Sequence, residues 1–216
     1  MAPNVAALVR LMLVTDDRLV AGRDLVALAR AAEAGGVTAL QLRLKAAPAR
    51  EQAALARALV AALRIPVLVN DRPDVALAAG AAGVHLGSDD LPVPLARAIA
   101  PVGFVIGASV GSEAEAAAAG EADYWGVGPW RVTTTEADAG AGLGPEGFRR
   151  LARLASGKPC LAIGAVAPDD VAAVHRAGGS GVAVVSGILA SPGISDLAIR
   201  AAAERYASEW ERAVGG

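Results

Sequence analysis

Lysine, cysteine and side-chain amides are all scarce in this chain. Of 216 residues, 20 are lysine or arginine, yet the only lysines are Lys45 and Lys158, and Cys160 is the only cysteine. A single cysteine excludes an internal disulfide framework and is typical of a reducing compartment, so we predict a cytoplasmic location. Cys160 stands in an apolar run, which indicates a small buried side chain rather than a nucleophile.

An excess of one charge and long apolar runs are also absent. The net charge is −2 and there is no basic cluster, so no nucleic-acid partner is expected. No uncharged apolar run approaches the roughly 20 residues of a membrane-spanning helix, so no membrane partner is expected. A hydrophobic content of 54% excludes a disordered chain. The composition therefore favours a folded enzyme or binding protein for small molecules, and it is compatible with a homo-oligomer.

What the chain does contain is a regular alternation of apolar runs and helical patterns. The apolar runs predict eight strands: Leu11–Thr15, Thr38–Leu44, Pro66–Val69, Gly83–Leu86, Phe104–Ala108, Asp123–Val127, Pro159–Ile163 and Val182–Val185. Continuous Val/Leu runs are typical of parallel strands that are buried on both faces. Eight helical patterns follow the strands, and several of them end at glycine, the usual helix C-cap.

Eight β/α units predict a single-domain (β/α)8 TIM barrel over residues 1–216. The alternative is a doubly wound open sheet, which usually has a glycine-rich first turn. The first turn here is Thr15-Asp16-Asp17-Arg18 and contains no glycine. We therefore expect the barrel, with its site at the C-terminal ends of the strands.

Two carboxylates follow neighbouring predicted strands. Asp71 comes directly after the third strand, and Asp90 follows the fourth strand within a short turn. Because parallel strands end at the same edge, these hard oxygen ligands would face a common volume and suggest Mg²⁺. The alternative is that each aspartate caps the helix that follows it.

The second strand carries two cations and an amide. Gln41, Arg43 and Lys45 alternate with leucines, so their side chains share one face of the strand. A buried cation needs an anionic partner, and an internal Arg43–Asp71 ion pair would satisfy one of them. Two adjacent cations are better explained by an anionic substrate, and the guanidinium fork suits phosphate oxygens.

Later turns carry weaker signals. The turns Gly164-Ala165 and Ser186-Gly187 follow strands seven and eight, where barrels often bind phosphate through backbone N–H groups, although ordinary turns use the same residues. Thr133–Thr135 suggests either a flap whose hydroxyls reach a phosphate or a solvated loop. We expect His85 to pack within its strand without a catalytic role, and His175 to lie on the surface of a helix.

Seven separated motifs occur in an order that matches a known family. They are LVTDDRLVAGRDL (13–25), AGGVTALQLRLK (34–45), VNDRPDVALAAGAAGVHLGSDDLP (69–92), GASV (107–110), ADYWGVGP (122–129), TTTEADAGAGLG (133–144) and AGGSGVAVVSGI (177–188). Together they resemble the thiamine phosphate synthase family, also called thiamine-phosphate pyrophosphorylase, from about residue 11 to residue 190.

The resemblance implies a transferase that joins hydroxymethylpyrimidine diphosphate to thiazole phosphate and releases pyrophosphate. The implied chemistry is dissociative and Mg²⁺-assisted, so it needs charge stabilisation and positioning rather than a nucleophilic side chain. By resemblance, Asp71 and Asp90 hold Mg²⁺, and the catalytic residues are Arg43, Lys45 and Ser109. The pyrimidine and its diphosphate are expected to bind to Gln41, Arg43, Lys45, Asn70 and Ser109. The thiazole phosphate is expected to bind to Thr133, Thr135, Gly164, Ala165, Val185 and Ser186.

The chain also departs from the family pattern. Residues that differ from the usual ones are Ser88 for glutamine, Gly111 for histidine, Glu136 for lysine, Ala165 for the second of two glycines, and Trp130-Arg131-Val132 for an aromatic-Pro pattern. Glu136 replaces a pyrophosphate-binding cation with an anion, and Arg131 is a candidate substitute. Two alternatives follow: a non-catalytic thiazole phosphate-binding barrel, and a thiazole tautomerase-like paralogue. The paralogue's catalytic histidine belongs where this chain has Pro129.

Overall fold

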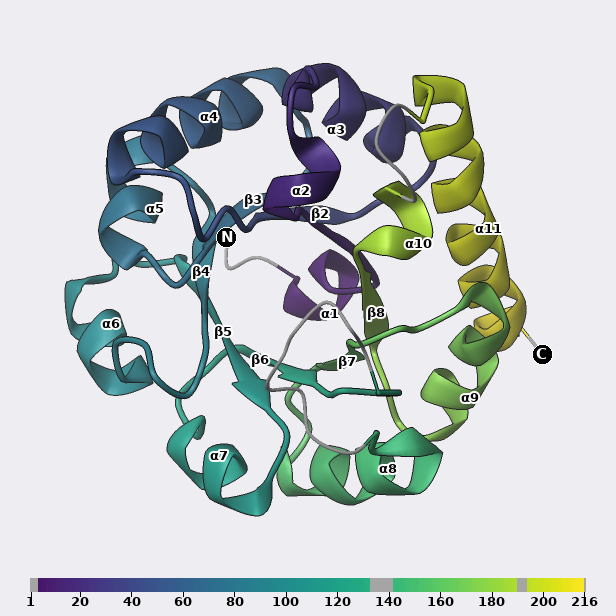
Figure 1. Cartoon of the computed structure of the whole chain (residues 1–216). Coiled ribbons are helices and arrows are strands. Elements are labelled where there is room, and N and C mark those ends of the chain that lie inside the picture. The colour runs from purple at the N-terminus through teal and green to yellow at the C-terminus, as the bar shows by residue number, and fades with distance from the viewer. Residues whose placement is uncertain (1–3, 133–141, 190–193, 216) are drawn as a thin grey trace.

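The fold is a closed barrel of parallel strands surrounded by helices (Figure 1). The computed structural model describes residues 4–132, 142–189 and 194–215. Its strands pair in chain order: β1 Leu11–Val14, β2 Ala39–Leu42, β3 Val67–Asn70, β4 Gly83–Leu86, β5 Val105–Val110, β6 Tyr124–Val127, β7 Cys160–Ala162 and β8 Gly181–Val184. β8 closes the ring on β1. The predicted (β/α)8 barrel is confirmed, with boundaries that move by a residue or two.

Helices surround the barrel and cover its ends (Figure 1). They are α1 Val5–Leu8, α2 Asp17–Val20, α3 Leu25–Ala34, α4 Ala49–Ala62, α5 Pro73–Ala79, α6 Val93–Ile99, α7 Glu113–Ala118, α8 Gly144–Leu154, η1 Pro168–Asp170, α9 Val171–Arg176, α10 Ser186–Leu189 and α11 Asp196–Gly215. The sequence patterns missed the short elements α1, α2 and α10, and treated η1 and α9 as one helix. Elements of three or four residues are too short to show a helical period.

Local chemistry explains several helix boundaries. α3 begins after Asp24, whose carboxylate accepts hydrogen bonds from the N–H groups of Val26 and Ala27. α5 begins at Pro73, where a missing N–H costs nothing, and ends at Gly80 with a left-handed φ of 69°. A capping carboxylate, a proline and a glycine therefore set where these helices begin and end.

Alternate residues of each strand enter two separate apolar layers. Leu11 and Leu13 of β1 pack between the barrel wall and the helices, whereas Met12 and Val14 point into the barrel interior. The interior layer includes Leu68, Leu161 and Tyr124 and is continuous with residues at the N-terminal end of the barrel. This period of two decides which polar side chains face the interior near the mouth.

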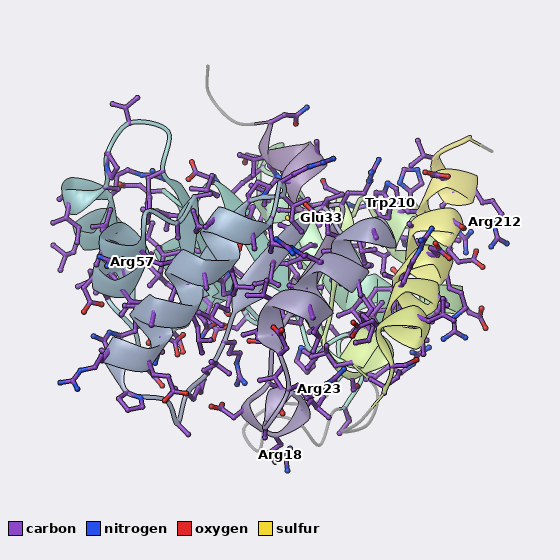
Figure 2. All side chains as sticks on the ribbon, turned by 90° about the horizontal axis from the view of Figure 1, so that it is seen from above. Arg18, Arg23, Glu33, Arg57, Trp210 and Arg212 are labelled. Atoms are coloured by element: carbon purple, nitrogen blue, oxygen red, sulfur yellow. The ribbon has the colours of Figure 1, made fainter. Side chains whose placement is uncertain are left out.

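α1 covers the end of the barrel opposite α2. Leu8 and Val9 are buried against the interior layer, and Figure 2 shows α1 on the far side of the barrel from Arg18. The backbone fits closely here, because a Cβ atom on Gly181 would lie 1.9 Å from the carbonyl oxygen of Val9.

His175 does not lie on the open surface, so that prediction is wrong. Its ring packs edge-on against Trp210 of α11, with the ring centroids 5.5 Å apart. α11 returns along α9 at the end of the chain, a contact between distant segments that the sequence pattern of α9 alone does not reveal. Cys160 is buried as expected, and burial raises the pKa of its thiol to about 12.

Among the described residues, no helix combines the length and the apolar character needed to cross a membrane.

The close approach of Gly181 in β8 to Val9, which follows α1, predicts that a side chain at position 181 lowers the stability of the fold. Gly181→Ala should lower the free energy of unfolding by about 3 kcal/mol, because the new methyl group collides with backbone rather than with a side chain that can rotate away. Thermal unfolding should then show a midpoint about 8 °C lower. The matched control is Gly120→Ala, whose Cβ would lie an ordinary 3.5 Å from the carbonyl oxygen of Ala117. Equal midpoints for the two variants would contradict the close fit.

Candidate active site

The C-terminal ends of β2 to β5 bring scarce polar residues to the mouth of the barrel. Asn70 of β3 lies beside His85 of β4 in the strand register, and Ser109 of β5 lies beside Gly126 of β6. Gln41 of β2 is buried, and its side-chain amide lies 3.6 Å from the sulfur of Met12 in the interior layer. The four predicted strand-end residues Gln41, Asn70, His85 and Ser109 therefore share one end of the barrel.

The segment after β2 is held by hydrogen bonds from β1 and its turn. The Thr15 hydroxyl donates to the carbonyl oxygen of Arg43 (3.0 Å) and accepts from its N–H (2.8 Å). The Asp17 carboxylate accepts from the N–H of Lys45 (2.9 Å) and of Ala46 (3.2 Å). Leu42 and Leu44, which alternate with Gln41, Arg43 and Lys45, pack outward in the layer between the barrel wall and the helices. These bonds fix the backbone of both cations at the mouth.

Asp71 and Asp90, which follow the neighbouring strands β3 and β4, interact with each other at the mouth. Burial and the neighbouring Asp90 carboxylate raise the pKa of Asp71 to about 6, and Lys45 and Arg43 oppose the shift. The Lys45 ammonium lies 3.9 Å from the Asp71 carboxylate in an ion pair. Asp71 itself adopts a left-handed φ of 63°, a conformation that aspartate tolerates better than most residues. The arrangement gathers two anions and two cations in one place.

Neither aspartate caps a helix. The N-cap of α5 is Arg72 and that of α6 is Pro92, and neither helix end has a side-chain cap. Asp90 instead accepts a 2.7 Å hydrogen bond from the N–H of Gly87. The capping hypothesis is therefore wrong, and the carboxylates remain available as ligands.

The acidic pair fits a hard divalent cation. Two carboxylates in close contact repel one another, and an ion between them removes that cost. Within residues 4–132, 142–189 and 194–215, no group of three or more His, Cys, Asp or Glu side chains has metal-binding geometry. Two carboxylates with a shell completed by substrate phosphates and water is the arrangement that Mg²⁺ commonly uses.

A buried polar network supports Ser109. His85 Nε2 lies 3.0 Å from the Ser109 hydroxyl, and His85 Nδ1 lies 2.9 Å from the Tyr124 hydroxyl. Burial lowers the pKa of His85 to about 4 and raises the pKa of Tyr124, and the Gln41 amide interacts with Tyr124. A neutral imidazole donates from one nitrogen and accepts at the other, so one of the two hydroxyl groups accepts a hydrogen bond from His85 and the other donates one to it. His85 packs within the barrel as predicted, but this support of Ser109 was missed.

Tyr124 is the functional residue that sequence analysis overlooked. It is fully buried on β6, and its ring lies so close to β5 that a Cβ on Gly107 would be 2.1 Å from Tyr124 Cζ. The available signal was Gly107 opposite an aromatic residue in the next strand, but their register is visible only once the strands are paired.

The turn after β7 has an unusual backbone. Gly164 (φ 97°) and Ala165 (φ 50°) are both left-handed, and a Cβ on Gly164 would lie 2.7 Å from Pro129 Cβ. Val185 and Ser186 follow β8 at the start of α10, and the Ser186 side chain is exposed. Thr133 and Thr135 lie outside the described residues, as does Glu136.

Arg131 does not offer an unpaired charge to a leaving group. Both terminal nitrogens of its guanidinium donate to the two carboxylate oxygens of Asp170, and one of them also donates to the carbonyl oxygen of Ala165 (3.1 Å). The hypothesis that Arg131 replaces the family's lysine is therefore not supported by its contacts.

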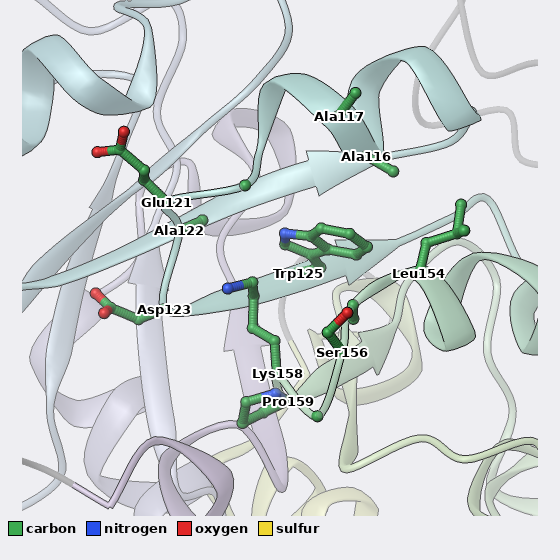
Figure 3. A pocket seen from close by; sticks show the side chains of 13 residues that line it. Ala116, Ala117, Glu121, Ala122, Asp123, Trp125, Leu154, Ser156, Lys158 and Pro159 are labelled. Atoms are coloured by element: carbon green, nitrogen blue, oxygen red, sulfur yellow. The ribbon is translucent and has the colours of Figure 1, made fainter.

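A hollow of the described surface lies elsewhere. It has a volume of about 740 Å³ between α7 and α8, beside the segments that lead into β6 and β7 (Figure 3). Two of its polar groups bind within the protein: Asp123 binds Arg97 and the N–H of Ile106, and the Trp125 indole donates to the carbonyl oxygen of Ala119. The predicted site residues lie instead at the C-terminal ends of the strands, and we place the site there.

The fold and site define a class: a parallel (β/α)8 barrel with an acidic pair and two cations at its mouth and a turn of two left-handed residues after β7. Residues 11–188 match the family model described as "Thiamine monophosphate synthase". The chain belongs to this family, and the predicted resemblance is confirmed.

Individual relatives agree. The chain is 48% identical over 193 residues to a thiamine-phosphate synthase of Azorhizobium caulinodans, which covers 87% of this chain and 91% of the relative. It is 45% identical over 206 residues to one of Methanoculleus marisnigri, covering 92% and 95%. A solved thiamine phosphate pyrophosphorylase from Pyrococcus furiosus superposes with a TM-score of 0.85 at 37% identity, covering 98% of this chain and all of the other. The predicted transferase is the interpretation that these relatives favour.

Burial of His85 predicts a pH-dependent stability difference. Because the pKa of His85 falls from 6.5 to about 4 on folding, the unfolded chain binds more protons between these values, and stability is lost as the pH falls. From pH 7.5 to pH 4, wild type should lose about 3 kcal/mol more free energy of unfolding than His85→Gln. Tyr124→Phe, which keeps the imidazole, should retain the wild-type dependence. Parallel losses in wild type and His85→Gln would contradict a buried neutral histidine.

Proposed function

We propose that this chain joins hydroxymethylpyrimidine diphosphate to thiazole phosphate, giving thiamine phosphate and pyrophosphate with the help of Mg²⁺. The observation that carries the proposal is the interacting pair of carboxylates, Asp71 and Asp90. The Lys45 ammonium lies 3.9 Å from the Asp71 carboxylate, and Arg43 is close enough to affect the pKa of Asp71. Anions and cations interleaved in this way match a metal diphosphate, whose oxygens bind both the ion and the cationic side chains.

Asp71 and Asp90 would hold Mg²⁺, which when bound neutralises charge on the departing pyrophosphate. Arg43 and Lys45 approach from β2 and stabilise the same leaving group by direct hydrogen bonds and charge. Their backbones are fixed by Thr15 and Asp17, so little reorganisation is needed as negative charge develops. The bond between the pyrimidine methylene carbon and the diphosphate oxygen breaks first, and the thiazole nitrogen then forms the new bond to that carbon.

Ser109, Gln41 and Asn70 would hold the pyrimidine ring. The neutral His85 presents one nitrogen to the Ser109 hydroxyl, so the hydroxyl orients toward the ring without a charge beside the developing cation. Gln41 is buried at the interior end of the same mouth. Polar but uncharged contacts suit a substrate that becomes electron-poor at the reacting carbon.

The thiazole phosphate would bind between the turn Gly164-Ala165 and the start of α10 at Val185 and Ser186. Consecutive left-handed residues can point successive N–H groups toward one anion, and a serine hydroxyl adds a donor. Thr133 and Thr135 are proposed to complete this pocket on the basis of sequence resemblance.

We also propose a cytoplasmic location and small phosphorylated substrates as the partners of this chain. One cysteine among 216 residues and a net charge of −2 support these proposals. The sequence is compatible with a homo-oligomer.

The direct test is an assay with both substrates and Mg²⁺. Thiamine phosphate and pyrophosphate should form in equal amounts, and a metal chelator should abolish the reaction. Absence of product under conditions where a standard synthase turns over would contradict the proposal. Calorimetry distinguishes the alternative of a non-catalytic thiazole phosphate-binding barrel. In that case thiazole phosphate binds tightly, whereas the pyrimidine diphosphate with Mg²⁺ does not bind.

Substitutions at the mouth should separate metal from cation effects. Asp71→Asn should lower kcat about a hundredfold and raise the Mg²⁺ concentration needed for half-maximal rate. Lys45→Met should lower kcat to a similar degree with an unchanged Mg²⁺ requirement, because Lys45 contacts phosphate rather than metal. The control is Asp74→Asn, an exposed aspartate of α5 paired with Arg72, which should behave as wild type. An unchanged metal requirement in Asp71→Asn would contradict its role as a ligand.

Glu136→Lys should raise kcat, because it replaces an anion with the cation that the family usually has beside the leaving group. A gain of about tenfold is expected from a charge-assisted contact, measured by pyrophosphate release. Glu136→Gln is the matched control and should give a smaller gain. Equal rates for wild type and both variants would show that other groups already stabilise the leaving group.

A further inference from the structure

The segment that follows β6 forms hydrogen bonds with the turn that follows β7. The N–H of Trp130 donates to Ile163 (2.7 Å), and the N–H of Arg131 donates to Gly164 (3.1 Å). The Arg131 side chain then reaches the carbonyl oxygen of Ala165. Backbone and side chain of one residue therefore bind two successive carbonyl groups of the same turn.

Asp170 anchors this arginine from the far side of the turn. Its carboxylate accepts from both terminal nitrogens of Arg131 and, at 2.7 Å, from the N–H of Ala167. The Asp170 side chain is 10% exposed, so this ion pair is shielded from water on the aspartate side. The buried Tyr206 hydroxyl donates to the carbonyl oxygen of Val166 (2.8 Å). Contacts therefore secure the turn at Gly164, Ala165, Val166 and Ala167.

The turn needs such contacts because its second residue is alanine. Ala165 has a φ of 50°, where a Cβ atom is crowded by the neighbouring backbone and glycine is favoured. Without support, alanine returns to negative φ, and the N–H groups of the turn change direction. A carbonyl held by a guanidinium that is itself fixed by Asp170 opposes this change.

We infer that Arg131 is a positioning residue for thiazole phosphate: bridged between Asp170 and the carbonyl oxygen of Ala165, it holds the Gly164-Ala165 turn left-handed so that its N–H groups face the phosphate. This inference rests on the proposed function for the identity of the ligand. It assigns a joint role to two departures from the family pattern, Arg131 and Ala165. The charge of Arg131 is matched by Asp170, so Arg131 acts through the turn rather than on the leaving group.

Steady-state kinetics of Arg131 variants test the inference. Arg131→Met should raise KM for thiazole phosphate about tenfold, with kcat and the KM for pyrimidine diphosphate within about twofold of wild type. Arg131→Lys should behave like Arg131→Met, because the lysine ammonium lacks the planar fork that bonds both carboxylate oxygens of Asp170 and the carbonyl oxygen of Ala165 at once. The control is Arg150→Met, which removes an exposed arginine 3.7 Å from Glu113. Full activity in Arg131→Lys, or a loss confined to kcat, would overturn the inference.

The substitution Ala165→Gly tests whether Arg131 acts through the conformation of the turn. Ala165→Gly should lower KM for thiazole phosphate at least fivefold more in the Arg131→Met background than in wild type, since glycine adopts positive φ without help. Equal effects of Ala165→Gly in both backgrounds would overturn the inference, because the arginine would then act independently of the turn.

Amide hydrogen exchange keeps this test separate from the proposed function. In the protein without ligand, the N–H groups of Val166 and Ala167 should exchange about tenfold faster in Arg131→Lys than in wild type, and Ala165→Gly should reverse the change. If the enzyme makes no thiamine phosphate but exchange responds in this way, the proposed function fails while the role of Arg131 in the turn stands. Unchanged exchange would overturn that role whatever the enzyme's activity.

Discussion

The site depends on the mutual repulsion of two carboxylates. Asp71 and Asp90 interact with each other at the barrel mouth, and burial together with the second negative charge raises the pKa of Asp71 to about 6. Near neutral pH the two carboxylates repel each other, and positive charge beside them lowers that cost. Lys45 and Arg43 supply part of that charge from the neighbouring strand, and a divalent cation would supply the rest. The repulsion between the two carboxylates is therefore the physical basis on which we propose that they bind a metal diphosphate.

A neutral half of the mouth complements this charged half. His85 is buried and uncharged, and it links Tyr124 inside the barrel to Ser109 at the edge. Burial disfavours a charged imidazole here and outweighs the nearby Asp90 carboxylate, which favours one. Tyr124 lies over Gly107, where no side chain would fit. The polar network thus supports Ser109, and its side chains occupy interior volume that apolar side chains would otherwise fill.

Much of the barrel could be predicted from local patterns. Each strand is a run of mostly apolar residues buried on both faces, so its position is visible without its neighbours. The predicted alternation put Gln41, Arg43 and Lys45 on one face, and the intervening Leu42 and Leu44 pack outward in the structure. Short elements escaped because α1, α2 and α10 span four residues each. His175 was misplaced because Trp210, which covers it, lies 35 positions further along the chain. The contacts of Arg131 with Asp170 were missed for the same reason.

By itself the sequence determined the strand order, the family resemblance and the list of polar residues at the strand ends, because these depend on local periodicity and on short motifs. Only the tertiary structure decided what each polar residue does. It removed Asp71 and Asp90 from helix capping, paired Lys45 with Asp71, set His85 between two hydroxyl groups, and tied Arg131 to Asp170. The physical reason is that hydrogen bonds and ion pairs act over a few ångströms, and closing the barrel brings together groups that lie far apart in the chain.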